Sequence, residues 1–475
     1  MNNIRRGLIQ LICVAVGAFY FWLLYRVLSF APINPDAGYY LSVVERVREG
    51  LVPYRDFRLH YTPLGIYLLG WGANLLGGGV PSYVAYVESM LVAQILCLIL
   101  TFVILRRLGL PKVSAALAAF TQGCIFIYYQ GSFIELEPYV LLFTLGTIYV
   151  CLSDVALSRR CFYAGLFAAL AFLSKQYGVA ALASSSVLLL PAGSILARLR
   201  RGALIALGFI LPLFFALTYY CVIAETSLSA VLTGVRRADL KFVLNEPWNL
   251  TAWGIEWSVA IVVIIAAFVR AQAKQRLVFS TLALAALSFV PQFMVRQSLH
   301  YFMLPSAPLF ILAVYAAFTL MQKFRVAKAR LLLCGFSLWC AMFVLLAGQE
   351  VLSFGDGSSR RHQLKEGEEL RALLPVESRA LLIADPMFFY TAQLRSFNEL
   401  GVGYDYPGLH SGTTIAAWVQ AATTVVVDRA DTLFYQRVEE ELMKNGDTLS
   451  GLLEREGFEQ TVSMRQGEVE IWRRG

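Results

Sequence analysis

The sequence predicts a polytopic α-helical membrane protein of about eleven transmembrane helices, followed by a small soluble α/β domain. Hydrophobic residues make up 58% of the 475 residues and charged residues only 15%, and the mean hydropathy is +0.62. A soluble domain is closer to half apolar and a quarter charged. Basic residues recur in short loops between long apolar runs, whereas the end of the chain has a soluble composition. We therefore predict a transmembrane domain over residues 1–350 and a soluble domain over residues 351–475.

Apolar runs of about 20 residues, the length of helix that crosses a bilayer, define the predicted spans. They are 7–30, 83–105, 112–130, 137–153, 161–175, 178–197, 203–223, 251–269, 277–294, 300–320 and 331–350. Arg5 and Arg6 precede the first run, but no small-residue cleavage site follows it, so we expect an uncleaved span and not a signal peptide. No internal repeat is visible, which argues against an inverted-repeat transporter.

The basic residues predict the orientation. Alternate loops carry Arg5/Arg6, Arg106/Arg107/Lys112, Arg159/Arg160, Arg198/Arg200/Arg201, Arg270/Lys274/Arg276 and Lys323/Arg325/Lys328/Arg330, with Asp154 as the only acid among them. By the positive-inside rule these loops and the N-terminus face the cytoplasm, and an odd number of spans places the C-terminus outside. The net charge of +8 is thus a topology signal, and we expect no nucleic-acid partner. The predicted outer face holds the loops 31–82, 131–137 and 224–250, turns near Lys175 and at 295–300, and the tail.

The eight cysteines lie inside or at the ends of predicted spans. Cysteine in such places is usually a small hydrophobic residue, so we predict neither disulfides nor a thiolate metal site. The tail reads as alternating helices and strands: a helix over 366–374, a strand over 380–385, a helix over 415–422, a strand over 423–428, helices over 431–444 and 447–456, and a closing hairpin of 459–465 and 468–473 around Gln466-Gly467.

The loop 31–82 carries the strongest candidate for chemistry. Asp36 opens a segment in which Tyr39, Tyr40, Val43, Val44 and Val47 recur at helical spacing, and Gly50 is a natural stop. This pattern predicts an amphipathic helix lying on the bilayer surface with its valines toward the lipid. Asp36 is then either the cap of this helix or a functional carboxylate at the water–lipid boundary.

Other polar residues on the predicted outer face have two readings each. Arg58 and His60 either bind an anionic headgroup or solvate a loop. Glu135 and Glu137 either bind a divalent cation or substrate, or Glu137 only caps the helix that follows it. Lys175 either serves the site or snorkels to the interface. Arg296 and His300, with Tyr301, form a further group of basic residues on the predicted outer surface. Together these groups suit a lipid-linked phosphate that carries a sugar, with the cations on the phosphate and a carboxylate taking the proton of an incoming hydroxyl.

Several short motifs resemble the GT-C membrane glycosyltransferases, in particular the dolichyl-phosphate-mannose and aminoarabinose-transferase-like group with its rhizobial galacturonosyltransferase-like members. The motifs are Asp36-Ala-Gly-Tyr39-Tyr40, Gly50-Leu-Val-Pro53-Tyr54-Arg55-Asp56, Tyr61-Thr62-Pro63-Leu64-Gly-Ile-Tyr67, Glu135-Leu-Glu137-Pro138, Leu173-Ser-Lys175-Gln176-Tyr-Gly178 and His300-Tyr301 with Pro305 and Pro308. The resemblance covers nearly the whole chain. Its most specific part is the pairing of the first motif with the Tyr-Thr-Pro-Leu motif.

This resemblance implies a multi-pass protein of a bacterial inner membrane that transfers a sugar, with inversion, from a polyprenyl phosphate to an acceptor hydroxyl in the periplasm. It implies Asp36 as general base and Tyr39, Tyr40, Tyr61, Gln176 and Tyr301 among the substrate-binding residues. The acceptor is a lipid, a glycan or a protein of the cell envelope. The residues leave metal dependence open: if a divalent cation, Mg²⁺ or Mn²⁺, is used, Asp36, Glu135 and Glu137 are the candidate ligands. Aminoarabinose transferases carry Glu-Lys before the proline that is Pro63 here, where this chain has Tyr61-Thr62, so the phosphate contact passes to Arg58, His60, Lys175 or Arg296.

Two other classes of protein are weighed against this one. A lipid or solute transporter, or flippase, predicts charged residues in the middle of spans, and the nearest polar pair that we identify is Glu88 and Gln94. A membrane-anchored sensor or scaffold would not need eleven spans.

Overall fold

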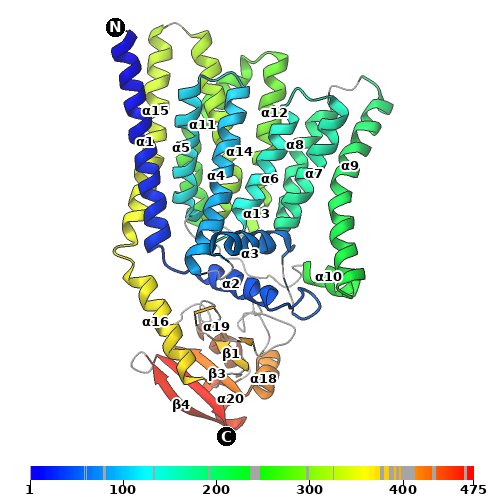
Figure 1. The fold of residues 1–475 in the computed structure, drawn as a ribbon, viewed down its shortest axis with the longest axis vertical. Coiled ribbons are helices and arrows are strands. Elements are labelled where there is room, and N and C mark those ends of the chain that lie inside the picture. Colours follow the sequence, from blue (N-terminus) through cyan, green and yellow to red (C-terminus); the bar gives the residue numbers. More distant parts are fainter. Residues whose placement is uncertain are drawn as a thin grey trace. The chain divides into compact units, whose positions relative to one another are not determined.

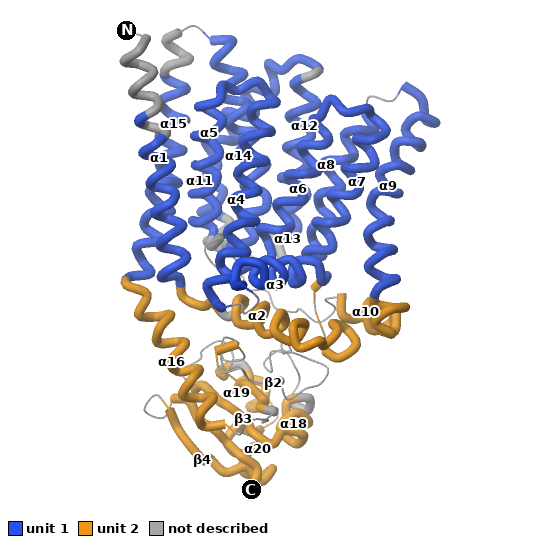
Figure 2. The backbone as a smooth tube through the Cα atoms, viewed as in Figure 1, with its two compact units in different colours: residues 1–31, 62–219, 243–355 blue, residues 32–61, 220–242, 356–475 orange. Residues whose placement is uncertain are grey.

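The computed structural model describes residues 2–57, 59, 61–78, 82–131, 134–190, 193–235, 247–295, 299–324, 326–374, 379–383, 390–391, 395–396, 412–429, 435–444, 446–464 and 468–475. The chain forms two compact units (Figure 2). Unit 1 comprises residues 1–31, 62–219 and 243–355, and unit 2 comprises 32–61, 220–242 and 356–475. Each unit is described by itself.

Unit 1 is helical (Figure 1). Its elements are α1 (Asn2–Phe30), α3 (Leu64–Leu76), α4 (Tyr83–Arg107), α5 (Lys112–Phe126), the π-turn η1 (Ile127–Gly131), α6 (Glu137–Cys151), α7 (Leu157–Ser174), η2 (Gln176–Ala180), α8 (Ala181–Ser185), η3 (Ser186–Leu189), α9 (Ile195–Thr218), α11 (Pro247–Val269), α12 (Ala273–Leu287), α13 (Val290–Val295), α14 (Leu299–Lys323) and α15 (Val326–Ser353). The π-turn η4 (Tyr219–Ile223) follows α9 directly and lies almost wholly in unit 2. Among the described residues, five helices are long and apolar enough to cross a membrane.

Most predicted spans correspond to helices with similar bounds, but the segment predicted as one helix over 178–197 has other bounds and is not a regular α-helix. The structure has η2, α8 and η3 in succession up to Leu189, and α9 begins only at Ile195. Ser184, Ser185 and Ser186 each donate a hydroxyl hydrogen bond to the carbonyl three residues earlier, at 2.7 Å. Such bonds compete with the regular helical ladder, which explains the tightened, broken path.

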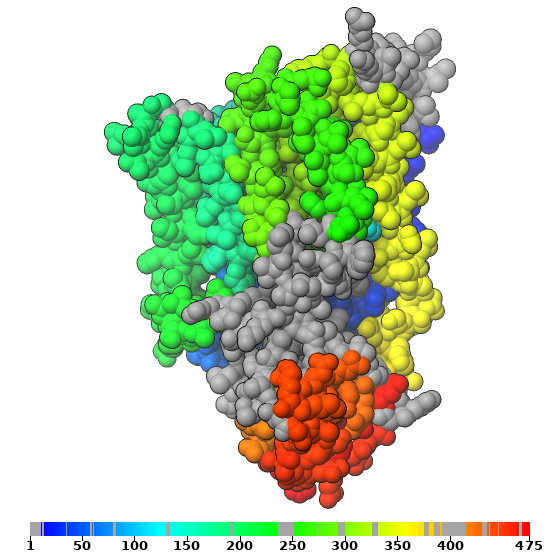
Figure 3. Space-filling view, turned by 180° about the vertical axis from the view of Figure 1, so that it is seen from behind, coloured from blue at the N-terminus to red at the C-terminus, as the bar shows by residue number. Residues whose placement is uncertain are grey.

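The apolar surface of unit 1 fits a lipid environment. Leu331, Leu338, Leu345 and Leu352 are 60–77% exposed and recur every seven residues along α15, so they form one stripe. The space-filling view shows the length of this helix in yellow (Figure 3). Large apolar side chains exposed in this way need an apolar solvent, which a bilayer supplies.

Helix α14 is the buried centre of unit 1, since 89% of its 18-residue apolar stretch is buried inside the protein. Helices α11, α12 and α15 pack against it, and α7 packs between α6 and α9. The α7–α9 contact depends on glycine. A Cβ atom on Gly165 would meet the Ile205 carbonyl oxygen at 2.0 Å, and one on Gly208 would meet the Phe162 oxygen at 2.0 Å. Small residues allow this backbone approach between helices in a membrane.

The loop predicted over 31–82 contains two helices. One is the predicted amphipathic helix, α2 (Pro35–Arg48), in unit 2. Its valines do not face lipid as we expected, since Val43 and Val44 are at most 1% exposed within the protein. The other, α3 in unit 1, was not predicted because its thirteen residues are too few to cross a bilayer.

Unit 2 contains α2, α10 (Leu228–Val235), α16 (Ser358–Leu373) and a five-stranded sheet of order β2-β1-β3-β5-β4. The strands are β1 (Arg379–Ile383), β2 (Arg395–Ser396), β3 (Thr424–Asp428), β4 (Phe458–Met464) and β5 (Val469–Arg474), with α18 (Gly412–Ala421), α19 (Tyr435–Met443) and α20 (Leu449–Arg455) between them. Strands β1, β2 and β3 are parallel, and β5 pairs antiparallel with β3 and β4. The predicted α/β composition and closing hairpin of the tail are confirmed.

Candidate active site

Asp36 lies in the first turn of α2 and does not cap the helix. The cap is Asn34, whose side chain accepts a hydrogen bond from the Ala37 amide at 2.7 Å, and Pro35 occupies the first helical position. The segment before the helix is held within unit 2 by Gln363 of α16, which exchanges two hydrogen bonds of 2.9 Å with the backbone of Ile33. The capping interpretation of Asp36 is therefore wrong. Among the described residues its half-buried carboxylate has no hydrogen-bond partner.

Tyr39, Tyr40 and Tyr61 form one aromatic cluster in unit 2. Their ring centroids are 5.6–6.0 Å apart and each side chain is at most 1% exposed. The Tyr61 carbonyl accepts a hydrogen bond of 2.5 Å from the Tyr54 hydroxyl, and Tyr54 has the left-handed φ of +68°. Beside it, the hydrogen bond from Arg55 lowers the pKa of Asp56. The three tyrosine rings thus pack together inside unit 2, and Tyr39 and Tyr40 lie on the same helix as Asp36.

The next residue of the Tyr61-Thr62-Pro63 motif belongs to unit 1. The Thr62 hydroxyl donates to the Phe172 carbonyl of α7 at 2.6 Å, and a Cβ atom on Gly65 would meet the Ser174 oxygen at 2.7 Å. The start of α3 is therefore fixed against the end of α7, where Lys175 follows.

A buried ion pair connects Glu137, at the start of α6, to Lys175, at the end of α7. The Lys175 Nζ is 2.7 Å from Glu137 Oε1, and the two side chains are 1% and 0% exposed. Tyr177 also donates a hydrogen bond to Glu137 Oε1. The rings of Tyr177 and Tyr301 lie 5.3 and 5.6 Å from Nζ, within the range of cation–π attraction. Snorkelling of Lys175 and capping by Glu137 are therefore both wrong, since each side chain is engaged inside the protein.

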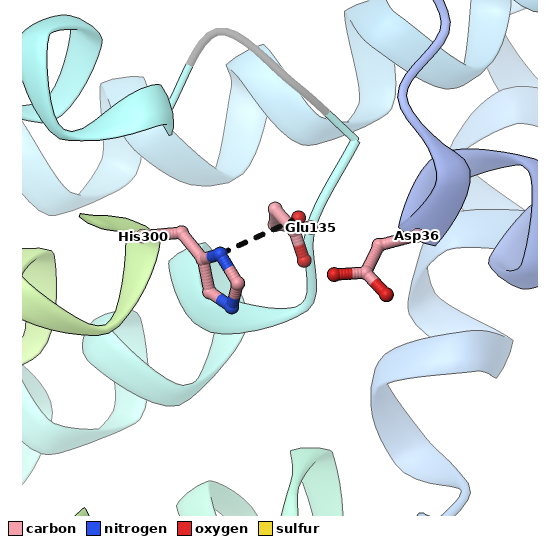
Figure 4. A group of neighbouring side chains, drawn as sticks. All are labelled: Asp36, Glu135 and His300. Atoms are coloured by element: carbon pink, nitrogen blue, oxygen red, sulfur yellow. Dashed lines mark ion pairs between the residues drawn. The ribbon is translucent and has the colours of Figure 1, made fainter. Parts of the chain in front are cut away.

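His300, at the start of α14, lies between two carboxylates. Its Nδ1 is 4.0 Å from Glu135 Oε1, the ion pair drawn in Figure 4, and its Nε2 is 3.9 Å from Glu137 Oε1. All three side chains are at most 7% exposed. Figure 4 also labels Asp36, which belongs to unit 2. Unit 1 thus brings together four of the predicted site residues, Glu135, Glu137, Lys175 and His300, from three helices and one loop.

This cluster contains the groups that acid–base or cation chemistry needs. It has two carboxylates, an ammonium group and an imidazole, all removed from water, where electrostatic interactions are stronger than at a surface. The Tyr301 ring packs beside the imidazole at a tilt of 49°, with ring centroids 4.1 Å apart. Gln176 is half-buried at the start of η2. Arg58, His60 and Arg296 lie outside the described residues, and their predicted roles stay predictions.

Two polar side chains, Tyr177 and Glu256, were not predicted from the sequence. Tyr177 stands in the Lys175-Gln176-Tyr motif and binds Glu137, and its proximity to Lys175 in the sequence was the available signal. Glu256 lies within the predicted span 251–269, where Tyr128 and Tyr129 bind it, although we identified no acid there. An ionisable residue inside a predicted span is itself a functional signal, which we should have applied to Glu256.

Comparisons with known proteins agree with this architecture. No protein-family model and no curated protein sequence matches the chain. Among solved structures, ArnT from Cupriavidus metallidurans in the apo state matches 97% of this chain and 97% of its own, with a TM-score of 0.63 and 13% identity. The same enzyme bound to undecaprenyl phosphate matches with the same coverage and TM-score, at 14% identity. The chain therefore shares the fold of ArnT, an aminoarabinose transferase of the kind that its motifs resemble.

Proposed function

We propose that the chain is an inverting glycosyltransferase that moves a sugar from a polyprenyl phosphate to an acceptor hydroxyl. The observation that carries this proposal is the set of charged and imidazole groups buried together in unit 1 of a fold shared with ArnT over 97% of the chain. ArnT has been seen with undecaprenyl phosphate, which supports a lipid-phosphate donor for this chain. A lipid-linked donor is activated before it reaches the enzyme, so no nucleotide site is required.

The proposed general base is Asp36. It is free of a capping role, and as a carboxylate it can accept the proton of an acceptor hydroxyl as that oxygen attacks the anomeric carbon. The C–O bond to the donor phosphate breaks as the new glycosidic bond forms, and the polyprenyl phosphate leaves. Attack from the face opposite the phosphate inverts the anomeric configuration.

The buried residues of unit 1 fit a divalent cation. Glu135 and His300 offer a carboxylate oxygen and a ring nitrogen 4.0 Å apart, a separation that ligand bonds of about 2.0–2.2 Å to one ion allow. We expect Asp36 to complete this donor set, because the predicted topology places the loops of Asp36 and Glu135 on the same face. Glu137 is engaged with Lys175 and is the weaker ligand candidate. An imidazole shifts the preference from Mg²⁺ toward Mn²⁺ or another transition metal. When bound, the cation would neutralise charge on the donor phosphate.

The proposed topology follows the basic loops. Eleven spans within residues 1–350 would place the N-terminus in the cytoplasm of a bacterium, and the loop 31–82 and the domain 351–475 in the periplasm. Acceptor and donor would then meet at the outer leaflet of the inner membrane. Cysteine accessibility to a membrane-impermeant thiol reagent at positions in these loops tests this arrangement.

Asp36→Asn tests the function. Purified wild-type protein in nanodiscs should release polyprenyl phosphate from a total polyprenyl-phosphate-sugar extract in the presence of a matching envelope extract, and mass spectrometry should detect both products. The variant should lose transfer by about 10³-fold or more, a loss typical when a positioned acid–base group is removed. Its unfolding temperature should stay near that of the wild type, because no hydrogen bond to Asp36 is lost within the described residues. Full transfer by the variant would exclude the role.

The same preparation distinguishes the second class of function. A transporter or flippase would move the lipid-linked sugar across the bilayer of a proteoliposome without consuming it. Glu256 is the kind of intramembrane acid that this alternative predicts, but both of its carboxylate oxygens are bound by tyrosines of the protein. We therefore expect no translocation in the absence of transfer.

A further inference from the structure

Glu256 is an acid inside α11, within the apolar segment Thr251–Val269. Both of its carboxylate oxygens accept hydrogen bonds from consecutive tyrosines: Tyr128 Oη is 2.5 Å from Oε1 and Tyr129 Oη is 2.6 Å from Oε2. An ionisable group in a span is costly to bury and usually functional, yet no step of the proposed transfer uses this one.

The two tyrosines belong to the π-turn η1 (Ile127–Gly131), which continues α5. Turns of this kind inside α-helices are rare and often occur at functional sites. Here the turn places the two phenol rings 4.9 Å apart against a single carboxylate. The arrangement therefore fixes η1 to α11 at two adjacent points.

Further hydrogen bonds hold this arrangement of Glu256, Tyr128 and Tyr129, which we call the clamp. Trp257 Nε1 donates to the Tyr129 hydroxyl at 2.8 Å, and Trp339 Nε1 of α15 donates to the Glu256 carbonyl at 2.7 Å. Trp257 is fully buried, and its ring contacts Trp339 at 5.2 Å between centroids. Glu256 is thus held by its side chain and by its backbone, and it joins three helical segments.

The turn η1, which precedes Glu135, and the helix α14, which carries His300, both contact this clamp. The turn η1 ends four residues before Glu135. On α14, Phe302 follows His300 by two residues, packs against Tyr129 at 6.1 Å between centroids and stacks on Trp253 of α11 at 5.8 Å. Trp253 Nε1 also donates to the Ser306 hydroxyl of α14 at 3.1 Å. Helix α11 is therefore the common support of the two segments.

We propose that Glu256 is a positioning residue: through Tyr128 and Tyr129 it fixes the turn η1, which ends four residues before Glu135, against the helix that carries His300, and so sets the approach of these two side chains. The inference rests on the proposed function in taking Glu135 and His300 as site residues. It assigns to the intramembrane acid a role in placing those groups, not in binding the substrate.

The test compares Glu256→Gln with Tyr129→Phe, Tyr128→Phe and the matched control Glu350→Gln. Glu350 is another acid in an apolar helix, α15, and among the described residues its side chain makes no hydrogen bond to Tyr128 or Tyr129. The first readout needs no substrate. In each background, Glu135→Cys and His300→Cys are joined by a short bifunctional thiol reagent, and mass spectrometry counts only the peptide that links positions 135 and 300. The second readout is steady-state transfer by variants that retain Glu135 and His300.

We expect the cross-link yield and kcat to fall in the order Glu256→Gln, then Tyr129→Phe, then Tyr128→Phe. Tyr129 ranks above Tyr128 because it also accepts the Trp257 hydrogen bond. For Glu256→Gln, kcat should fall by about 10- to 100-fold, as a displacement near 1 Å can cause, while the donor KM stays within about twofold. Glu350→Gln should match the wild type in both readouts.

Wild-type cross-linking and kcat in all three variants would overturn the proposal, as would an equal loss in Glu350→Gln, which would indicate general destabilisation. If Glu256→Gln does not fold, the two tyrosine variants decide the matter, since each removes one hydroxyl and keeps the carboxylate. If wild-type protein shows no transfer, the proposed function fails, and the cross-link yield alone still tests the positioning role.

Discussion

The ion pair between Glu137 and Lys175 offers a stability prediction that can be worked from the structure. Glu137→Gln keeps the size of the side chain and removes its charge, and it leaves the Lys175 ammonium buried without its carboxylate 2.7 Å away. Both side chains are at most 1% exposed, so water cannot compensate. Breaking a buried pair in this way costs about 3–5 kcal/mol. Lys175→Met should cost a similar amount, because it leaves the carboxylate uncompensated.

The double variant Glu137→Gln/Lys175→Met removes both charges and should be less destabilised than the sum of the two single variants. We expect a coupling free energy of about 2–3 kcal/mol, the upper end for side chains in direct contact. Equilibrium unfolding in mixed micelles, followed by tryptophan fluorescence, measures the four corners of this cycle. Additive costs, with the double variant as unstable as the sum of the singles, would refute the assignment of a buried ion pair.

Two further predictions concern the cation and the helix packing. Removal of divalent cations with EDTA should abolish transfer, and added Mn²⁺ should restore it. His300→Ala should weaken Mn²⁺ binding by at least about tenfold. Transfer that is unaffected by EDTA would contradict the cation site. Gly208→Leu should destabilise the protein by at least about 1–3 kcal/mol because its Cβ would meet the Phe162 oxygen at 2.0 Å, whereas Gly202→Leu, in open space, should unfold like the wild type. Equal stability of the two variants would show that α7 and α9 do not pack as described.

Much of the fold follows from patterns that local physics enforces. Long apolar runs give helices, and the hairpin and strand patterns of the tail give the sheet between residues 379 and 474. The predicted helices are wrong or missing where the local sequence pattern is weak or where contacts distant in the sequence decide the structure. Hydroxyls at Ser184–Ser186 break a run that hydropathy alone reads as one helix, and the short glycine-containing run of α3 looks like a loop.

The site was predicted less completely, because sequence gives residue types and not partners. Glu135, Glu137, Lys175 and His300 were identified by type and predicted face, and unit 1 does bring them together. No local pattern could show that Lys175 is bound by Glu137, since 38 positions separate them. The alternatives of capping and snorkelling are local by nature, so they were the natural readings before the fold was known.

The pairing of Lys175 also decides how a phosphate could be held. The Lys175 ammonium lies 2.7 Å from the Glu137 carboxylate and both side chains are buried, so this pair carries no net charge. Lys175 therefore offers little attraction to an anionic headgroup. A donor phosphate then needs additional positive charge at the site. A divalent cation held by Glu135 and His300 would supply it within unit 1, and Arg58, His60 or Arg296 would supply it from the predicted outer loops. The pairing of Lys175 thus argues against a site in which Lys175 alone holds the phosphate.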